Sequence, residues 1–185
     1  MRRLVPSQTA VLVIDVQERL AGAMPAPQMA ELTRATTVLL EAAKLLGAPV
    51  IYSEQYPAGL GKTIAPIAEA LERVGATRIE KVDFSACDDP SFARAWASLS
   101  VKAVVAVGME SHVCVYQTVR ELCARGVEVY VPLDGVASRR DDHRATGLSL
   151  CHAAGATVTT METVVFDWLA RAGSPEFKQL SKLIR

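Results

Sequence analysis

The chain has 185 residues, half of them apolar, and its 20 basic side chains balance 20 acidic ones. This length is large enough to bury most apolar surface around one core, so we expect residues 1–185 to form a single domain. The even charge argues against nucleic acid as a partner, and the composition argues against disorder.

The apolar stretches are too short to cross a membrane. The run at residues 101–109 is interrupted by Lys102 and is far below the roughly 20 residues that span a bilayer. The run at residues 10–14 ends at Asp15 and is too short for a signal-peptide core, which favours a cytoplasmic protein. The four cysteines lack metal-binding spacing and are expected as free thiols: Cys87, Cys114, Cys123 and Cys151.

Short runs rich in Val and Ile alternate with longer segments of helical spacing, which is typical of repeated βαβ units. The expected strands are residues 10–15, 49–53, 78–82, 103–108, 127–131 and 157–160. The expected helices are residues 28–46, 64–73, 91–99, 112–125, 142–154, 162–170 and 176–183. Gly47, Gly126 and Gly155 stand where a helix must stop before a strand. The sequence therefore predicts an α/β fold, a three-layer αβα sandwich with a six-stranded, mostly parallel sheet.

Two ionisable residues stand at strand ends, where function collects in parallel sheets. Asp15 closes the first strand, where burial can perturb the pKa of a catalytic acid or base, although it could equally cap the following turn. Lys81 shares a strand face with Ile79 and can orient a carboxylate or stabilise negative charge there. The alternative for Lys81 is a packed stem whose amine reaches water.

Cys114 follows the fourth strand. With Ser111 as the N-cap, its thiol would lie in the first turn of a helix, where free amides and the helix dipole lower a thiol pKa. Amides near Val113 and Cys114 could also hold an oxyanion. Cys114 could instead be a buried structural thiol. Cys123 and Cys151 are expected in the core, and Cys87 in an exposed loop.

Together these positions resemble the isochorismatase-like cysteine hydrolases. The resemblance covers nearly the whole chain and lies in AVLVIDVQ, EKVDFSA, VGMESHVCVYQTV and VYVPLDGVASR. It implies that Asp15 acts as the base, Lys81 orients it and Cys114 attacks a carbonyl. It also implies a cis peptide bond between Met109 and Glu110.

The loop at residues 54–61 is similar to the branch of isochorismatase-domain proteins with poorly defined substrates, more than to nicotinamidases. Nicotinamidases hold a divalent metal through histidines after the second strand, and residues 53–56 here contain no histidine. His143 and His152 lie far along the chain on a helix, so we expect no catalytic metal. No glycine-rich fingerprint follows the first strand, so we expect no dinucleotide cofactor. The expected lining of the substrate pocket is Gln17, Gln55, Tyr56, Leu60, Phe84 and His112.

The sequence leaves three functions open. The leading hypothesis is hydrolysis of the amide bond of a small molecule through a thioester on Cys114. The second is hydrolysis of a vinyl ether, in which protonation by Asp15 matters and a thiol need not. The third is a non-catalytic oligomeric binding protein. We expect a homo-oligomer, to which the apolar residues 164–169 could contribute, although core packing is the commoner use of such a stripe.

Overall fold

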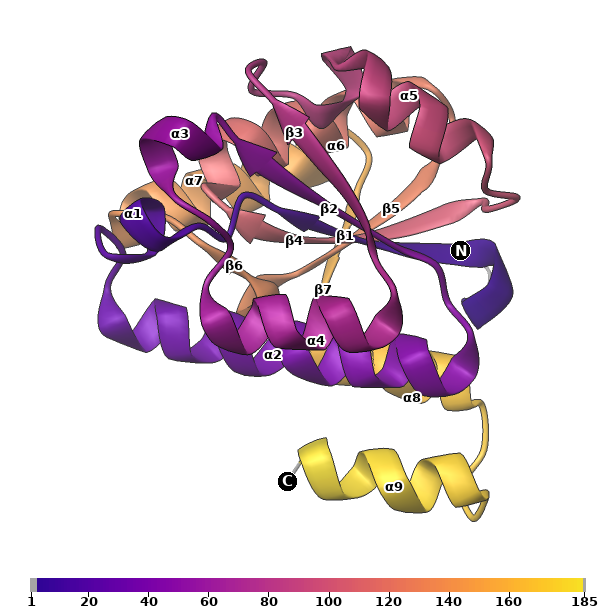
Figure 1. Ribbon diagram of the computed structural model, residues 1–185. Helices are drawn as coiled ribbons and strands as arrows, with labels where there is room; N and C mark the ends of the chain where they lie inside the picture. Colours follow the sequence, from indigo (N-terminus) through magenta and orange to yellow (C-terminus); the bar gives the residue numbers. More distant parts are fainter. Residues whose placement is uncertain (1–2, 185) are drawn as a thin grey trace.

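The computed structural model describes residues 3–184, and all six expected strands are present. They lie in the order β3–β2–β1–β4–β5–β7, and every pairing within this sheet is parallel (Figure 1). A short extra strand, β6, pairs with the end of β4. The bounds are β1 Thr9–Ile14, β2 Val50–Gln55, β3 Thr77–Lys81, β4 Ala103–Met109, β5 Glu128–Pro132, β6 Val136–Ala137 and β7 Thr157–Thr159.

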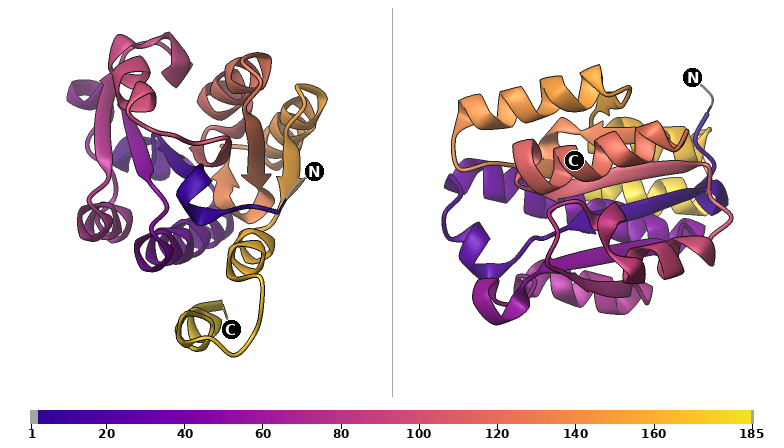
Figure 2. Two further views of the ribbon diagram at one scale, coloured as in Figure 1. Left: turned by 90° about the vertical axis from the view of Figure 1, so that its right-hand side faces the viewer. Right: turned by 90° about the horizontal axis from the view of Figure 1, so that it is seen from above.

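Helices cover both faces of the sheet, which gives the expected three layers (Figure 1; Figure 2). One face is covered by α2 Ala26–Leu46, α4 Ala65–Val74 and α8 Met161–Leu169. The other is covered by α5 Pro90–Ala97, α6 Tyr116–Ala124 and α7 Asp141–Ala153. The last helix, α9 Pro175–Ile184, packs outside α2 and α8 through the buried Leu180. None of the helices described between residues 3 and 184 has the length and apolarity needed to cross a bilayer.

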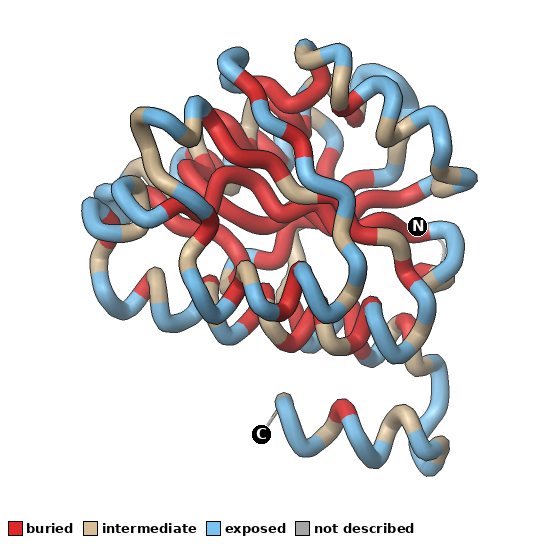
Figure 3. Tube along the Cα trace, in the orientation of Figure 1, coloured by how far each residue is buried: buried red, intermediate tan, exposed pale blue. Residues whose placement is uncertain are grey.

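The core consists of two apolar layers, one on each side of the sheet. Buried positions run along the central strands (Figure 3). Both β1 and β4 are buried at every position, because they lie in the middle of the sheet with helices on each side. In the C-terminal apolar stripe, Val164, Val165 and Trp168 are buried in the layer that α2 shares. This stripe therefore serves core packing.

The order of the strands reverses beside β1. From β1 the chain moves outward through β2 and β3, and it then returns to β4 on the opposite side of β1. In open parallel sheets, such a reversal leaves a crevice at the carboxyl ends of the two central strands. Here these ends are followed by Asp15 and by the segment that carries Cys114.

The helix expected from residue 112 begins differently from the prediction. Residues Ser111–Val115 form a π-helical turn, and α6 starts only at Tyr116. Ser111 is not the N-cap: it is the first residue of the turn, whose N-cap is Glu110, and its hydroxyl lies 2.7 Å from the Ser138 hydroxyl.

Several short elements were not expected. They are the helices α1 Glu18–Ala21 and α3 Pro57–Leu60 and the 3₁₀ turns Pro6–Gln8, Ala86–Asp88 and Leu133–Gly135. Both short helices lie on the side of the sheet where the strands end (Figure 1).

Gly108 sets the close approach of the two central strands. Its φ is +128°, and a Cβ there would lie 2.0 Å from the Ile14 carbonyl oxygen. Gly47, which ends α2 at φ +75°, has open space around it.

We expect Gly47→Ala to lower the free energy of unfolding by about 1 kcal/mol, because of backbone strain. Gly108→Ala should lower it by about 3–5 kcal/mol, because strain and collision act together. Denaturant unfolding measures both, and equal losses would contradict the packing argument.

Candidate active site

Asp15 leaves β1 in a left-handed conformation, with φ +52°. This turn places its side chain in the interior, where it is fully buried. Its Oδ1 accepts a hydrogen bond from the Ser53 hydroxyl at 2.7 Å, and its Oδ2 accepts one from Lys81 Nζ at 2.7 Å. The carboxylate is therefore held by side chains from two neighbouring strands. The alternative that it merely caps the following turn does not describe these contacts.

Lys81 points inward from the last position of the edge strand β3. The alternation that places it on one face with Ile79 is confirmed, since both are buried while the residues between and before them are exposed. Besides Asp15, its ammonium contacts Gln55 Oε1 at 2.6 Å and the carbonyl oxygens of Asp83 and Phe84. The amine does not reach water. These four acceptors occupy the three N–H donors of the ammonium, which fits an orienting role better than a direct contact with substrate.

Cys114 lies in the π-helical turn and is 6% exposed. Burial raises the pKa of its thiol to about 12, and the negative charge of nearby Asp15 adds to this rise. Lys81 opposes the shift but does not overcome it. The prediction of a lowered pKa is wrong, because burial and a neighbouring carboxylate outweigh any effect of a helix start.

The peptide bond between Met109 and Glu110 is cis, at the position that the resemblance implied. The amide of Val113 is already bound, since it donates to the Glu110 carbonyl at 3.0 Å. Val113 is therefore a poor oxyanion donor.

Gln17 and Gln55 are taken up by the framework of the site. The side-chain nitrogen of Gln17 donates to the backbone carbonyl oxygens of Gln55 and Gly61, and its side-chain oxygen accepts from the backbone N–H of Gln55. The Gln55 side chain bridges Lys81 Nζ and the Val82 carbonyl oxygen. Both residues hold the loop at the end of β2 in place, and neither has the free amide expected of a pocket-lining residue.

Tyr56, Leu60 and Phe84 lie near the surface. Tyr56 and Phe84 are more than half exposed, whereas Leu60 is half-buried. Tyr56 lines a cavity of about 240 Å³ together with residues of α3 and the end of β3.

His112 is half-buried, two residues before Cys114. Its Nδ1 lies 3.1 Å from the Ser138 hydroxyl, and its ring lies 4.5 Å from that of His143. Burial lowers the pKa of His112; Glu110 opposes this shift and His143 adds to it.

Two serines that contact this group were not predicted. Ser53 pairs in register with Ile14, so a polar residue directly after the apolar start of β2, beside the end of β1, was the available signal. Ser138 is buried and contacts both Ser111 and His112 across 26 or more residues of chain. No local pattern indicates the contact of Ser138.

The other thiols differ in part from expectation. Cys151 is buried as predicted, and burial raises its pKa to about 12. Cys123 is half-buried against the same core layer. Cys87 is also buried, which contradicts the expected exposed loop, and burial raises its pKa to about 11. Residues 86–88 form a 3₁₀ turn that folds this thiol toward Thr118.

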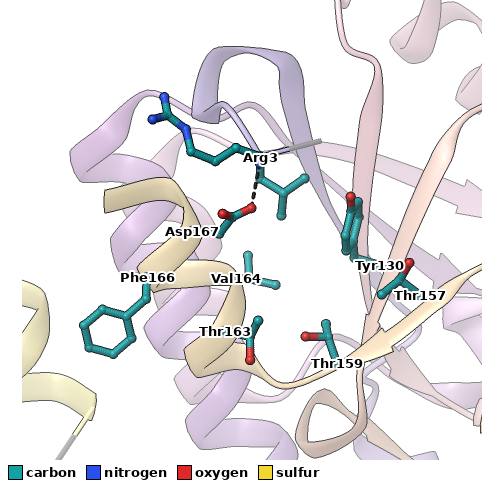
Figure 4. A pocket seen from close by; sticks show the side chains of 9 residues that line it. Arg3, Tyr130, Thr157, Thr159, Thr163, Val164, Phe166 and Asp167 are labelled. Carbon is teal, nitrogen blue, oxygen red and sulfur yellow. Dashed lines mark hydrogen bonds between the residues drawn. The ribbon is translucent and has the colours of Figure 1, made fainter. Parts of the chain in front are cut away.

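A cavity of about 570 Å³ lies on the opposite face of the sheet, between β7, α8 and the N-terminal arm (Figure 4). Tyr130 and Val164 in its lining belong to one core layer, whereas Cys114 belongs to the other. The carboxylate of Asp167, which also lines this cavity, accepts a hydrogen bond from the backbone N–H of Leu4. This cavity is separate from the group around Cys114.

An acid, an amine and a thiol thus meet at the point where the strand order of a doubly wound α/β sheet reverses. This is the arrangement of an α/β protein with a hydrolase-like site. Residues 9–163 match the model of the isochorismatase domain. The chain belongs to the isochorismatase-like hydrolase family.

Similar proteins agree with this assignment. The chain is 34% identical over 185 residues to the secreted isochorismatase effector Isc1 of Phytophthora sojae, covering 99% of this chain and 87% of that protein. It is 35% identical to isochorismatase domain-containing protein 1 of Salmo salar, covering 98% of this chain but only 62% of that longer relative.

Solved structures share the fold. The structure of MAR1 ribonuclease from Caenorhabditis elegans is 34% identical with a TM-score of 0.89, covering 99% of this chain and 92% of that one. The YcaC gene product of Escherichia coli, described as an octameric hydrolase of unknown specificity, is 20% identical with a TM-score of 0.89, covering 98% and 90%. At this identity, the second likeness concerns the fold alone.

The contacts of Cys114 predict how its pKa responds to charge. Asp15→Asn removes the negative charge that raises the pKa of this thiol, so the pKa should fall and thiolate should form at lower pH. Ultraviolet titration of the thiolate, with the other three cysteines replaced by alanine, measures this change. Asp167→Asn, the same change on the opposite face of the sheet, should leave the titration unchanged. An equal or higher pKa in Asp15→Asn would contradict the proximity of the two groups.

Proposed function

We propose that this protein hydrolyses the amide-type C–N bond of a small molecule through a thioester on Cys114. The observation that carries the proposal is one buried carboxylate that binds a buried ammonium and lies close enough to a thiol to raise its pKa. A buried Asp beside a thiol can take its proton, which is the usual way to activate a nucleophile of high pKa.

In the first step, Asp15 takes the proton of the Cys114 thiol while the sulfur attacks the substrate carbonyl. The amide of Cys114 is our candidate to hold the oxyanion, since that of Val113 is bound to Glu110. The protonated Asp15 then gives its proton to the leaving amine as the C–N bond breaks. This leaves a thioester and an ionised Asp15.

In the second step, Asp15 takes a proton from water, and the resulting hydroxide attacks the thioester carbonyl. The C–S bond breaks, the sulfur regains its proton from Asp15, and the acid is released. Lys81 contacts Asp15 and protein carbonyl groups, so we assign to it the orientation of Asp15 throughout.

The high pKa of Cys114 is compatible with this scheme. At neutral pH the thiol is protonated, so the free enzyme stores the proton that the leaving amine later needs. Asp15, held in place by Lys81, is the group that receives it. The chemistry then depends on proton transfer from Cys114 to Asp15 rather than on a free thiolate.

Two other functions remain alternatives. A vinyl ether hydrolase would use Asp15 as a proton donor without the sulfur. A binding protein would hold a small molecule without reacting with it. A ribonuclease activity, which the name of one similar structure indicates for that protein, is not favoured here. The net charge of this chain is zero, whereas polyanion binding draws on excess basic residues.

Cys114→Ala distinguishes these functions. On a small amide, ureide or carbamoyl amino acid that the protein turns over, this variant should lose at least about a thousandfold in kcat, because the attacking atom is gone. Mass spectrometry of the wild-type protein should find an acyl adduct on Cys114. Cys87→Ala, which removes another buried thiol, should keep kcat within about twofold. Full activity of Cys114→Ala would eliminate the thioester route and favour the vinyl ether route.

We also propose that the protein needs no metal or other cofactor and that it works as a cytoplasmic homo-oligomer. Three large apolar side chains near the carboxyl edge of the sheet support self-association: Tyr56 is 58% exposed, Val82 76% and Phe84 56%. Apolar groups gathered on a surface favour contact with another protein surface.

Sedimentation tests the homo-oligomer. Wild-type protein should sediment as a multiple of the 19.9 kDa chain. Val82→Lys should shift the protein toward the single chain, because a charge replaces an apolar contact. Leu45→Lys, at another exposed apolar position at the end of α2, should leave the mass unchanged. A wild-type protein that sediments as a single chain at every concentration would refute self-association.

A further inference from the structure

The stretch after β5 contains a segment for which the proposed reaction gives no role. Residues 136–139 follow a 3₁₀ turn and run beside the end of β4. Within them, β6 pairs with β4 in parallel, matching Val136 to Gly108 and Ala137 to Met109. The segment therefore contacts the chain directly before the turn that carries Cys114.

Ser138 continues these contacts beyond the strand. Its hydroxyl accepts a hydrogen bond from the Ser111 amide at 3.1 Å and lies 2.7 Å from the Ser111 hydroxyl. It also lies 3.1 Å from Nδ1 of His112. A hydroxyl has one proton and two acceptor sites, so these three contacts use its full capacity.

Arg139 binds the residue between β4 and the turn. Its backbone amide donates to the Glu110 carboxylate at 3.0 Å, and its Nε donates to the same group at 3.1 Å. Glu110 is almost fully buried. Its position is therefore set by segment 136–139 rather than by solvent.

Ser138 is itself fixed from behind by α2. The side-chain oxygen of Gln28 accepts a hydrogen bond from the Ser138 amide at 2.9 Å, and its nitrogen donates to Asp141 at 2.7 Å. Gln28 and Ser138 are both buried. The first turn of α2 thus connects the start of α7, Ser138 and the turn at residues 111–115.

We infer that Ser138 is a positioning residue for Cys114. Every residue from Gly108 to His112 is paired with one of residues 136–139. The turn Ser111–Val115 is π-helical, and the contacts of residues 136–139 fix its first two residues in addition to the turn's own backbone hydrogen bonds. Loss of the hydroxyl would leave the Ser111 amide without a partner in the interior and allow the turn, and with it the sulfur, to shift. This inference rests on the proposed function, in which the sulfur is the reacting atom.

The test uses acrylamide as a probe, because its reaction reports the reactivity of the Cys114 thiol when no substrate is known. The thiol adds across the double bond of acrylamide, its sulfur bonds to carbon, and its proton ends on the neighbouring carbon. Mass spectrometry follows this adduct on Cys114 in the folded protein. For Ser138→Ala, we expect a roughly tenfold to hundredfold lower rate of adduct formation, with kcat falling alike and KM within about twofold.

Thr9→Val is the matched control. Thr9 is also fully buried, and its hydroxyl donates to the Val5 carbonyl oxygen at 2.8 Å, at the opposite end of β1. The control should lose comparable thermal stability but keep the wild-type rate of adduct formation. Ser138→Thr retains a hydroxyl and should recover a large part of the rate; it also serves if Ser138→Ala does not fold.

Two outcomes overturn the inference. One is a rate of adduct formation in Ser138→Ala that equals the control, and the other is an equal loss in Ser138→Ala and Ser138→Thr. Failure of the proposed function can be told apart from failure of this inference. It would appear as substrate turnover by Cys114→Ala, whatever the rate of adduct formation in the Ser138 variants.

Discussion

The buried ion pair between Asp15 and Lys81 is the interaction on which the site depends. Both side chains are completely buried, so each charge requires the other together with the surrounding hydrogen-bond partners. Removal of one member of such a pair typically costs about 3–5 kcal/mol, because the remaining charge is left unpaired. Ser53, Gln55 and two carbonyl oxygens complete the shell. Together they hold the Asp15 carboxylate in one position in the interior, beside a thiol.

That environment changes how Cys114 is understood. A thiol at a helix start suggests a stable thiolate, but burial and the carboxylate keep the proton on sulfur. In the reaction that we propose, this thiol becomes reactive only when its proton moves to Asp15 in contact with substrate. In that scheme the reactivity of the sulfur depends on its placement. The contacts of residues 108–112 with a segment 26 to 29 residues further along the chain therefore bear on the site.

Family membership and chemical specificity are set by different parts of this molecule. The parallel sheet and its strand ends define the family, and they are buried and densely paired. By contrast, Tyr56, Val82 and Phe84 are exposed, and we propose self-association at this surface. Loops at the carboxyl edge can vary without loss of the core, which is why one fold can serve many substrates.

The sequence alone determined the order of strands and helices and the family. Apolar runs of strand length, alternating with helical spacing, are local patterns, and residues such as Asp15 and Lys81 stand at strand ends that a parallel sheet must gather. Gly47, Gly126 and Gly155 likewise take the positive φ that their positions predicted. Tertiary structure alone decided the pKa direction of Cys114, the burial of Cys87, the π-helical turn at Ser111 and the framework role of Gln17 and Gln55. These depend on burial and on partners such as Ser53 and Ser138, which are distant in the chain, and no local pattern encodes which distant groups will meet.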